Sequence, residues 1–365
     1  MTVHQWVPAA HRGDAVGDHA RRARDVFRAM GHASDLFAIK TTPGIDSRNR
    51  FPESSLDDVR SWEEADARTA DVTIFHFATA SPMSEAFGTL HGRRVLHYHN
   101  VTPAKFFVPY DANLARISTT ARAELAALAG HVDLAVGDSD FNCRELQSLG
   151  FNRTRTVPIL LDLDRLRNAP RVPALEWVLQ DGLTNILFVG RLVPNKRIED
   201  HIRLAEHYKR YVDVAYRFIF VGRYDVVPGY YESIRAMVST YRMVPERFWF
   251  AGPVPEAELA AYYRNAHAYV SMSEHEGFCV PLVEAMAMDV PVLAYAEAAV
   301  PETLGGAGVS FRPKDLEIAA ELLGGLIYDE PFRQNVLAGQ RARVRDFARD
   351  RTETALEDML EIVTA

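Results

Sequence analysis

Two basic side chains lie in the segment GRLVPNK, residues 190–196, between a predicted strand and a helix expected to begin near Ile198. The planar guanidinium of Arg191 can hold two oxygens of a phosphate, and Lys196 adds a point charge. The first amides of the helix have no partners within it and also attract anions. The segment therefore suits a diphosphate, and the alternative is a solvated basic loop.

Two carboxylates lie eight residues apart in SEHEGFCVPLVEAM, residues 273–286. We place Glu276 in a loop and Glu284 in the first turn of a helix that Pro281 can open. Both carboxylates can then face the same cleft, where each could accept hydrogen bonds from neighbouring hydroxyls of a ribose or a hexose. For Glu284 alone, the alternative is a first-turn glutamate that stabilises the helix dipole.

Three histidines lie at the ends of two predicted strands in the first half of the chain. His97 and His99 alternate along VLHYHN and therefore share a face, and His76 ends the preceding predicted strand. A buried histidine with a purely structural role is the alternative for each of them.

Two Asp-x-Asp triplets could hold a divalent metal: Asp138-Ser139-Asp140 and Asp162-Leu163-Asp164. The first lies between a predicted strand and a helix, where Asp or Ser can cap the helix N-terminus. The second lies in the expected connection between domains. We expect helix capping at the first triplet and no bound metal.

The scaffold of these segments is predicted by β-rich runs that alternate with helical patterns, which is typical of parallel sheets. Strands are expected at residues 3–8, 36–40, 72–78, 95–99, 134–137 and 155–160, and then at 186–190, 218–222, 248–252, 268–272 and 290–295. Helices are expected at residues 120–129, 139–149 and 352–362. Glycines end the first three strands of the second set, at the strand ends where open parallel sheets bind ligands.

The length of 365 residues and the two strand sets predict two domains, with residues 162–182 as the connection. The 41 Lys and Arg against 49 Asp and Glu give a net charge of −8, which argues against a nucleic-acid partner. Cys143 and Cys279 are too few and too far apart for a disulfide framework or a zinc cluster.

The chain has neither the pattern of a signal peptide at its start nor an apolar run of the ~18 residues that a membrane span needs. We therefore expect a cytoplasmic protein. Four arginines could give at most a peripheral membrane contact, and the alternative is a solvated helix face. These are Arg21, Arg22, Arg24 and Arg28.

Residues 186–312 contain GRLVPNK, EGFCVPLVEAMA and PVLAYAEAAVPE in this order. In motif order and spacing they resemble the retaining, nucleotide-sugar-dependent glycosyltransferases of the GT-B fold, glycosyltransferase family 4. The resemblance implies an α/β protein of two Rossmann-like domains that face each other across a cleft. It places them at residues 1–165 on the acceptor side and 166–345 on the nucleotide-sugar side, with a last helix, residues 346–365, packing back on the first domain.

The resemblance further implies that a hexose moves from a UDP- or GDP-sugar to an acceptor hydroxyl, with retention of configuration and without a metal or other cofactor. The acceptor would be a glycan, a lipid-linked molecule or a small molecule, in bacterial surface polysaccharide, glycolipid or glycoside synthesis. A GT-B-fold nucleotide-sugar epimerase is the alternative. A nicotinamide dehydrogenase is disfavoured, because no Gly-x-Gly-x-x-Gly loop follows the first predicted strand.

For individual residues, the resemblance implies that Arg191 and Lys196 hold the diphosphate, that Glu284 binds the ribose and that Glu276 binds the transferred sugar. His99 is expected beside the sugar, and His76 and His97 on the acceptor side of the cleft. The remaining expected donor contacts are Gly17, in RGDAVGDH at residues 12–19, and Gly190, Gly277, Phe278 and Cys279.

This chain differs from the family pattern where the pattern has glycines. Cys279 replaces one glycine, Met288 and Asp289 replace a Cys-Gly pair, and Ala298 and Ala299 replace two glycines. None of these changes removes a charged donor contact.

Overall fold

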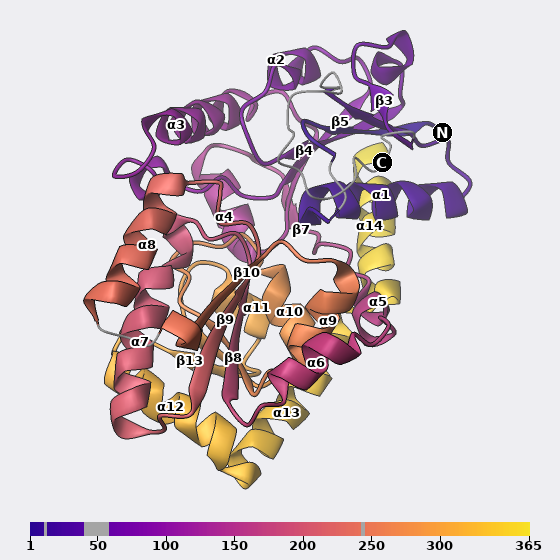
Figure 1. Ribbon diagram of the computed structural model, residues 1–365. Coiled ribbons are helices and arrows are strands. Elements are labelled where there is room, and N and C mark those ends of the chain that lie inside the picture. Colours follow the sequence, from indigo (N-terminus) through magenta and orange to yellow (C-terminus); the bar gives the residue numbers. More distant parts are fainter. Residues whose placement is uncertain (11–12, 40–57, 242–244) are drawn as a thin grey trace. The chain divides into compact units, whose positions relative to one another are not determined.

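The computed structural model describes residues 1–10, 13–39, 58–241 and 245–365, so Arg12 and Lys40 lie outside the described residues. The chain divides into two units, each built on one parallel sheet (Figure 1). Unit 1 comprises Met1–Ala104, Asn113–Leu161 and Ala348–Ala365, and unit 2 comprises Lys105–Ala112 and Asp162–Phe347. Unit 2 thus includes a short segment from the first third of the chain.

The sheet of unit 1 has seven strands in the order β3-β2-β1-β4-β5-β6-β7, and the strand pairs are parallel. The strands are β1 (Val3–Val7), β2 (Leu36–Ala38), β3 (Arg60–Ser61), β4 (Val72–Phe77), β5 (Arg93–Tyr98), β6 (Leu134–Gly137) and β7 (Thr154–Thr156). Every residue of β1 and β4 is buried, because helices cover both faces of the sheet.

Two apolar cores cover the two faces of this sheet. One core contains side chains of α2 (Met83–Gly88), α3 (Ala112–Ala127) and α4 (Asp140–Ser148). The other contains side chains of α1 (Ala15–Ala29) and of the last helix, α14 (Arg349–Thr364). Leu356, Met359, Leu360 and Val363 of α14 are buried there, so the C-terminal helix belongs to the core of unit 1.

Of the four arginines of α1, only Arg28 is exposed, so together they form neither the membrane-facing patch nor the solvated face considered above. Arg21 and Arg24 are buried, and both pair with Asp58, at 3.1 and 3.2 Å. Arg22 donates to the carbonyl of Leu160. These three arginines find their acceptors on two other parts of unit 1, the carboxylate of Asp58 and the carbonyl of Leu160.

The sheet of unit 2 has six parallel strands in the order β10-β9-β8-β11-β12-β13. They are β8 (Thr184–Val189), β9 (Tyr216–Val221), β10 (Phe248–Gly252), β11 (Ala268–Ser271), β12 (Val292–Tyr295) and β13 (Val309–Phe311). The sequence did not predict β3 or β13, which have only two and three residues.

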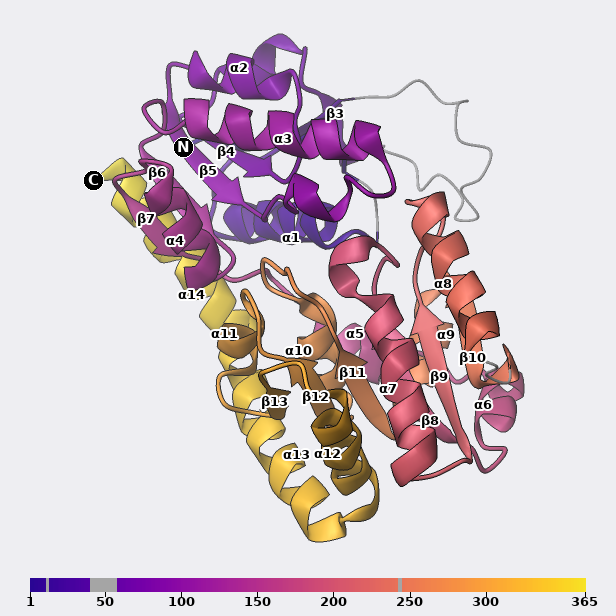
Figure 2. The same cartoon turned by 90° about the vertical axis from the view of Figure 1, so that its left-hand side faces the viewer.

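The helices of unit 2 contact one another along a connected series. α7 contacts α8 and α12, whereas α10 contacts α5, α11 and α13, and Figure 2 shows α12 and α13 side by side. The helices are α5 (Leu163–Arg167), α6 (Pro173–Leu179), α7 (Ile198–Tyr211), α8 (Pro228–Thr240), α9 (Glu256–Arg264), α10 (Val280–Ala287), α11 (Val300–Leu304), α12 (Leu316–Tyr328) and α13 (Glu330–Val344). Short 3-10 turns are η2 (Ala65–Arg68), η3 (Ala104–Phe106), η4 (Pro194–Lys196), η5 (Pro245–Arg247) and η6 (Arg345–Phe347).

Residues 162–182, the expected connection between domains, contain two helices that the sequence did not predict, α5 and α6. Asp162 caps α5 by accepting a hydrogen bond from the amide of Arg165, and Pro173 lies in the first turn of α6. Both helices pack on α9. Within the described residues, no helix combines the length and hydropathy that crossing a membrane requires.

Candidate active site

The loop after β8 carries the two basic residues predicted to bind a diphosphate. Lys196 ends η4, and Arg197, with φ 53°, turns the chain into α7. The side chain of Arg191 is exposed, and no described residue forms a hydrogen bond or ion pair with it. Arg191 is thus available to a ligand as it stands.

The glycine at the end of β9 is required by backbone packing. Gly222 has φ 136°, and a Cβ at this position would lie 2.2 Å from the carbonyl oxygen of Gly190. The two strand ends can therefore approach only if residue 222 has no side chain. Backbone packing alone therefore explains why residue 222 is glycine, without a role in ligand binding.

The loop after β11 lies directly against the loop after β8. Lys196 Nζ lies 2.5 Å from Glu276 Oε1, in an ion pair whose side chains are both mostly buried. The amide of Glu274 donates to the carbonyl of Asn195 at 2.9 Å, and Asn195 Nδ2 donates to the carbonyl of His275 at 2.9 Å. The structure therefore brings Lys196 and Glu276 together, and Asn195, which sequence analysis did not single out, joins the two loops.

Glu284 lies at the fifth residue of α10 and not in its first turn. The interpretation of Glu284 as a first-turn residue is therefore wrong. α10 begins at Val280, directly after Cys279 with φ 73°, and so one residue before Pro281. Tyr263 Oη donates to Glu284 at 3.0 Å, and Arg165 lies 3.4 Å from its other oxygen. Burial, together with the nearby Glu284 carboxylate, raises the pKa of Tyr263 well above its usual value.

The residues between the two carboxylates are largely buried. Phe278 packs edge-on against Phe347, with ring centroids 5.5 Å apart, and its carbonyl accepts the hydroxyl of Thr303. Burial, and secondly the Glu276 carboxylate, raises the pKa of the Cys279 thiol. Cys279 is therefore an uncharged packing residue in this loop.

The predicted residues of unit 1 form a buried histidine cluster. One nitrogen of each ring lies within 4.8 Å of those of the other three, in a group consisting of His19, His76, His97 and His99. His19 was not predicted, although it follows Gly17 by two residues in the segment at residues 12–19. Gly17 lies in the first turn of α1, where its amide donates to the capping residue Asp14.

Hydrogen bonds run through this cluster to one carboxylate. His76 Nδ1 lies 2.9 Å from His99 Nε2, and His76 Nε2 lies 2.9 Å from Gln5 Oε1. His99 Nδ1 and His97 Nε2 lie 3.0 and 2.9 Å from the two oxygens of Asp138. Both ring nitrogens of His99 are thus engaged, and a ligand could reach one of them only if a hydrogen bond opened.

The first triplet does cap α4, but Asp138 is not the capping residue. Ser139 is the cap, since its hydroxyl accepts from the amide of Asn142 at 3.2 Å. Asp138 is fully buried, which alone would raise its pKa. The neighbouring His99 and His97 outweigh the burial and lower the pKa of Asp138 well below its usual value.

The proton arrangement follows from what each atom can donate. Because the ionised Asp138 only accepts, His99 donates from Nδ1 and, when neutral, accepts at Nε2 from His76 Nδ1. His76 then accepts at Nε2, which requires the amide nitrogen of Gln5 to face it. In the structure Gln5 Oε1 faces this nitrogen, so two neutral rings require the Gln5 amide to be turned over.

The ring of His19 completes the cluster. Its Nδ1 accepts from the amide of Leu160 at 3.0 Å, so a neutral ring carries its proton on Nε2. Burial, and then the three neighbouring histidines, lowers the pKa of His19 well below 6.5. A metal ion in this cluster would have to displace hydrogen bonds at several of the rings.

Comparisons with known proteins agree on one family. The family model described as "Glycosyl transferases group 1" matches residues 176–343. The "GDP-mannose-dependent alpha-mannosyltransferase" of Mycobacterium tuberculosis is 30% identical over 303 residues, which cover 77% of this chain and 75% of that protein. "O-antigen chain mannosyltransferase B" of Escherichia coli is 26% identical over 217 residues, covering 58% of this chain and 55% of that protein.

The extent of the matches differs between sequence and structure. The chain spans about half of the mannosyltransferase B sequence, and about a fifth of the "Serotype-specific mannosyltransferase WbdA" of Escherichia coli, which is 26% identical over 163 residues. Sucrose-phosphate synthase of Thermosynechococcus elongatus has a TM-score of 0.75 at 18% identity, covering 100% of this chain and 99% of that one. Anabaena HepE, solved with UDP-glucose, has a TM-score of 0.75 at 14% identity, covering 99% and 100%. These likenesses show the fold, GT-B, as expected.

Proposed function

Since the chain belongs to the glycosyl transferases group 1 family, glycosyltransferase family 4, we propose that it transfers a hexose from a nucleoside diphosphate sugar to an acceptor hydroxyl with retention of configuration. The observation that carries the proposal is the pairing of Lys196 with Glu276, in a loop that also carries the exposed Arg191. One loop supplies the cations that a diphosphate needs, and the other supplies a carboxylate for sugar hydroxyls.

The cations act on the leaving group. Departure of a nucleoside diphosphate builds negative charge, and a preorganised donor aimed at such charge is worth ~10²–10³ in rate. Arg191 is unpaired within the described chain, whereas Lys196 must share its charge between Glu276 and the diphosphate. Binding of the diphosphate then frees lone pairs of Glu276 for hydroxyls of the transferred sugar.

No side chain is required as the general base in this proposal. In front-face attack, the acceptor hydroxyl forms its bond to the anomeric carbon on the side from which the diphosphate leaves. Because the new bond forms on that same face, the configuration is retained, and the leaving phosphate oxygen takes the acceptor proton. Glu284, which accepts from Tyr263 and lies near Arg165, would bind the ribose by accepting hydrogen bonds from its hydroxyls.

The histidine cluster has a different part in the proposal. The hydrogen bonds of His76 and His97 favour a supporting role, in which they fix the end of β5. His99, at that strand end, is the one proposed to lie beside the sugar, and its ring would have to exchange one internal hydrogen bond for the ligand.

The donor and acceptor classes are proposed from the relatives. Three of the matched proteins are named as mannosyltransferases, one of them as GDP-mannose-dependent, which makes GDP-mannose the first donor to test. UDP-glucose is the second, because Anabaena HepE was solved with it. The names of the relatives include O-antigen and colanic acid synthesis, so a growing surface polysaccharide is the first acceptor to test.

Calorimetric titration with GDP, UDP, GDP-mannose and UDP-glucose tests the donor and the roles of the two glutamates. Glu284→Ala should weaken the nucleotide and the nucleotide sugar alike, whereas Glu276→Ala should weaken only the nucleotide sugar. Equal losses for both ligands in both variants would refute this division. Conversion of the donor to a new sugar without an acceptor would favour the epimerase.

A further inference from the structure

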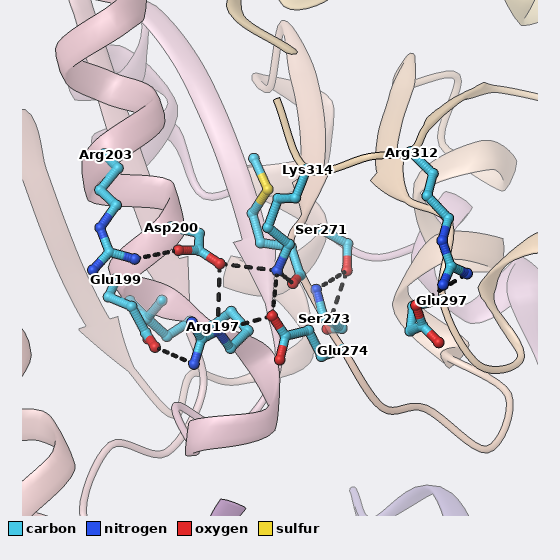
Figure 3. A network of polar contacts seen from close by, with 12 residues as sticks. Arg197, Glu199, Asp200, Arg203, Ser271, Ser273, Glu274, Glu297, Arg312 and Lys314 are labelled. Atoms are coloured by element: carbon cyan, nitrogen blue, oxygen red, sulfur yellow. Dashed lines mark hydrogen bonds and ion pairs between the residues drawn. The ribbon is translucent and has the colours of Figure 1, made fainter. Parts of the chain in front are cut away.

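Lys314, in the segment between β13 and α12, places its ammonium group against the first turn of α7 and the loop after β11 (Figure 3). Lys314 Nζ lies 2.9 Å from Asp200 Oδ2, 2.9 Å from Glu274 Oε1 and 3.1 Å from the carbonyl oxygen of Met272. An ammonium has three protons, and these three contacts use all of them. The same nitrogen lies 4.3 Å from the centre of the Tyr295 ring, which adds a cation–π contact.

The partners of Lys314 come from the two segments that build the proposed donor site. Asp200 lies in the first turn of α7, four residues after Lys196. Met272 and Glu274 lie in the loop after β11, and Glu276 follows Glu274 by two residues. Lys314 therefore joins, from a third loop, the segments whose relative position sets the distance between Lys196 and Glu276.

Arg197 is the second cation of this network. Its Nε lies 3.3 Å from Asp200 Oδ2 and 3.2 Å from Glu274 Oε1, and its guanidinium lies 2.9 Å from Glu199 (Figure 3). Arg203 lies 2.6 Å from the other oxygen of Asp200. Three cations thus face three carboxylates, which are those of Glu199, Asp200 and Glu274.

Asp200 cannot lose a partner without cost, because only 4% of its side chain is exposed. Burial alone would raise its pKa, but the hydrogen bond and charge of Lys314, together with Arg197, lower the pKa below the usual value. Without Lys314, Glu274 and the carbonyl of Met272 would each lose one contact, and Met272 and Glu274 would no longer be tied to Asp200 through its ammonium group. Arg197 would still bind Asp200 and Glu274, so we expect the loop to loosen and the fold to survive.

We infer that Lys314 is a positioning residue for the donor site, which holds the Glu276 loop in register with Lys196 without touching the donor. The inference deepens the proposed function and rests on it for the identity of the ligand. Nothing in the family motifs at residues 190–196 and 276–287 indicates this lysine, which follows the last motif in the chain.

The matched pair of variants is Lys314→Met and Arg312→Met. Both remove one basic residue from the same loop, but Arg312 is 62% exposed and pairs with Glu297 at 3.1 Å, away from the network (Figure 3). Lys314→Arg keeps the charge and serves as the rescue variant. Glu274→Gln removes one partner of Lys314 and tests the same contact from the loop side.

Two measurements decide the inference. Hydrogen–deuterium exchange of residues 272–279 should be faster in Lys314→Met than in the wild type, and unchanged in Arg312→Met. In titration and in steady-state assays, Lys314→Met should weaken the nucleotide sugar about tenfold, with a change of about twofold or less for the bare nucleotide. Lys314→Arg should recover part of the sugar affinity, and Glu274→Gln should show a smaller loss in the same direction.

Wild-type exchange in this loop together with wild-type sugar affinity in Lys314→Met would overturn the inference. Equal loss of both ligands in Lys314→Met, or the same loss in Arg312→Met, would also overturn it, since a general loss of stability has that signature. A wild-type protein that binds neither GDP, UDP, GDP-mannose nor UDP-glucose would instead refute the proposed function. The exchange comparison would then still decide whether Lys314 holds the loop.

Discussion

Replacing Asp138 by asparagine separates the buried carboxylate seen in the structure from the helix cap that the sequence suggested. Asparagine has the same shape and is as good a cap as aspartate, so a capping role predicts almost no loss of stability. In the structure, however, the carboxylate accepts from His97 Nε2 at 2.9 Å and from His99 Nδ1 at 3.0 Å. The amide can accept only through its single oxygen.

The expected loss follows from these two contacts. A hydrogen bond to a charged group contributes roughly 1.5–3 kcal/mol, so the two bonds together contribute about 3–6 kcal/mol. One neutral bond, worth about 1 kcal/mol, survives in the amide, which leaves a loss of about 2–5 kcal/mol. This is a large fraction of the 5–15 kcal/mol that is typical of a domain.

The control is Asp140→Asn, the same change two residues later. Asp140 is exposed in the first turn of α4 and accepts from the Thr156 hydroxyl, so its loss should stay near 1 kcal/mol or below. Urea unfolding gives the free energies, and hydrogen exchange assigns them to a unit. Protection of β4, β5 and β6 should fall in Asp138→Asn, whereas protection of β8 to β12 should not.

A loss in Asp138→Asn no larger than in Asp140→Asn would refute the reasoning. Equal loss of protection in both sheets would refute it too, because the contacts of Asp138 with His97 and His99 lie within unit 1.

Four further predictions follow from the same structure. Arg191→Ala should lower kcat by ~10²–10³ with little change in the urea midpoint, whereas Lys196→Ala should lower both kcat and the urea midpoint because it leaves the mostly buried Glu276 unpaired; wild-type turnover in either would remove the diphosphate assignment. Exhaustive chelation should leave activity intact, and loss that Mg²⁺ or Mn²⁺ restores would contradict the metal-free mechanism. Ala298→Gly should stabilise by about 1 kcal/mol because Ala298 has φ 55°, whereas Ala299→Gly, at φ −82°, should destabilise; urea midpoints compare the two. Burial lowers the pKa of His201 from 6.5 to about 4, so the unfolded chain binds the extra proton between these values. Stability should therefore fall by on the order of 3 kcal/mol as the pH drops from 6.5 to about 4, and urea midpoints should fall less in His201→Gln.

The strands could be predicted because a strand buried on both faces is a short apolar run with a clear beginning and end. The interval expected for β6, Leu134–Gly137, is the observed one, and the expected β10, Phe248–Gly252, is also unchanged. β3 and β13 could not be predicted, since neither Arg60–Ser61 nor Val309–Phe311 is a continuous apolar run. The helices α5 and α6 were missed because prolines and charges are equally typical of caps and of linkers.

The partners of Asp138 could not be predicted, although the triplet was recognised. Asp138 and Ser139 are both good caps, and the local sequence does not say which side chain turns back to the helix. His97 and His99, which attract the carboxylate, precede it by about 40 residues and reach it only through the pairing of β5 with β6. Local patterns predict that a polar residue lies at a strand end, whereas its partner is set by the order of strands in the sheet.

The positions where this chain lacks the glycines of the family pattern show what holds the proposed donor loop in place. Cys279, Asp289 and Ala298 have φ values of 73°, 56° and 55°, so the backbone conformation that glycine adopts without strain is kept here by residues with a Cβ. Each such residue costs roughly 1–2 kcal/mol, and the conformation persists only where neighbours over-determine it. Around Cys279 these neighbours are the hydroxyl of Thr303 on the carbonyl of Phe278 and the amide of Ala299 on the carbonyl of Glu276. With Lys314 on Glu274, they fix the loop from outside the motif. The motif residues of this loop would therefore define the chemistry of the site, while its geometry also depends on contacts with Ala299, Thr303 and Lys314 from elsewhere in the chain.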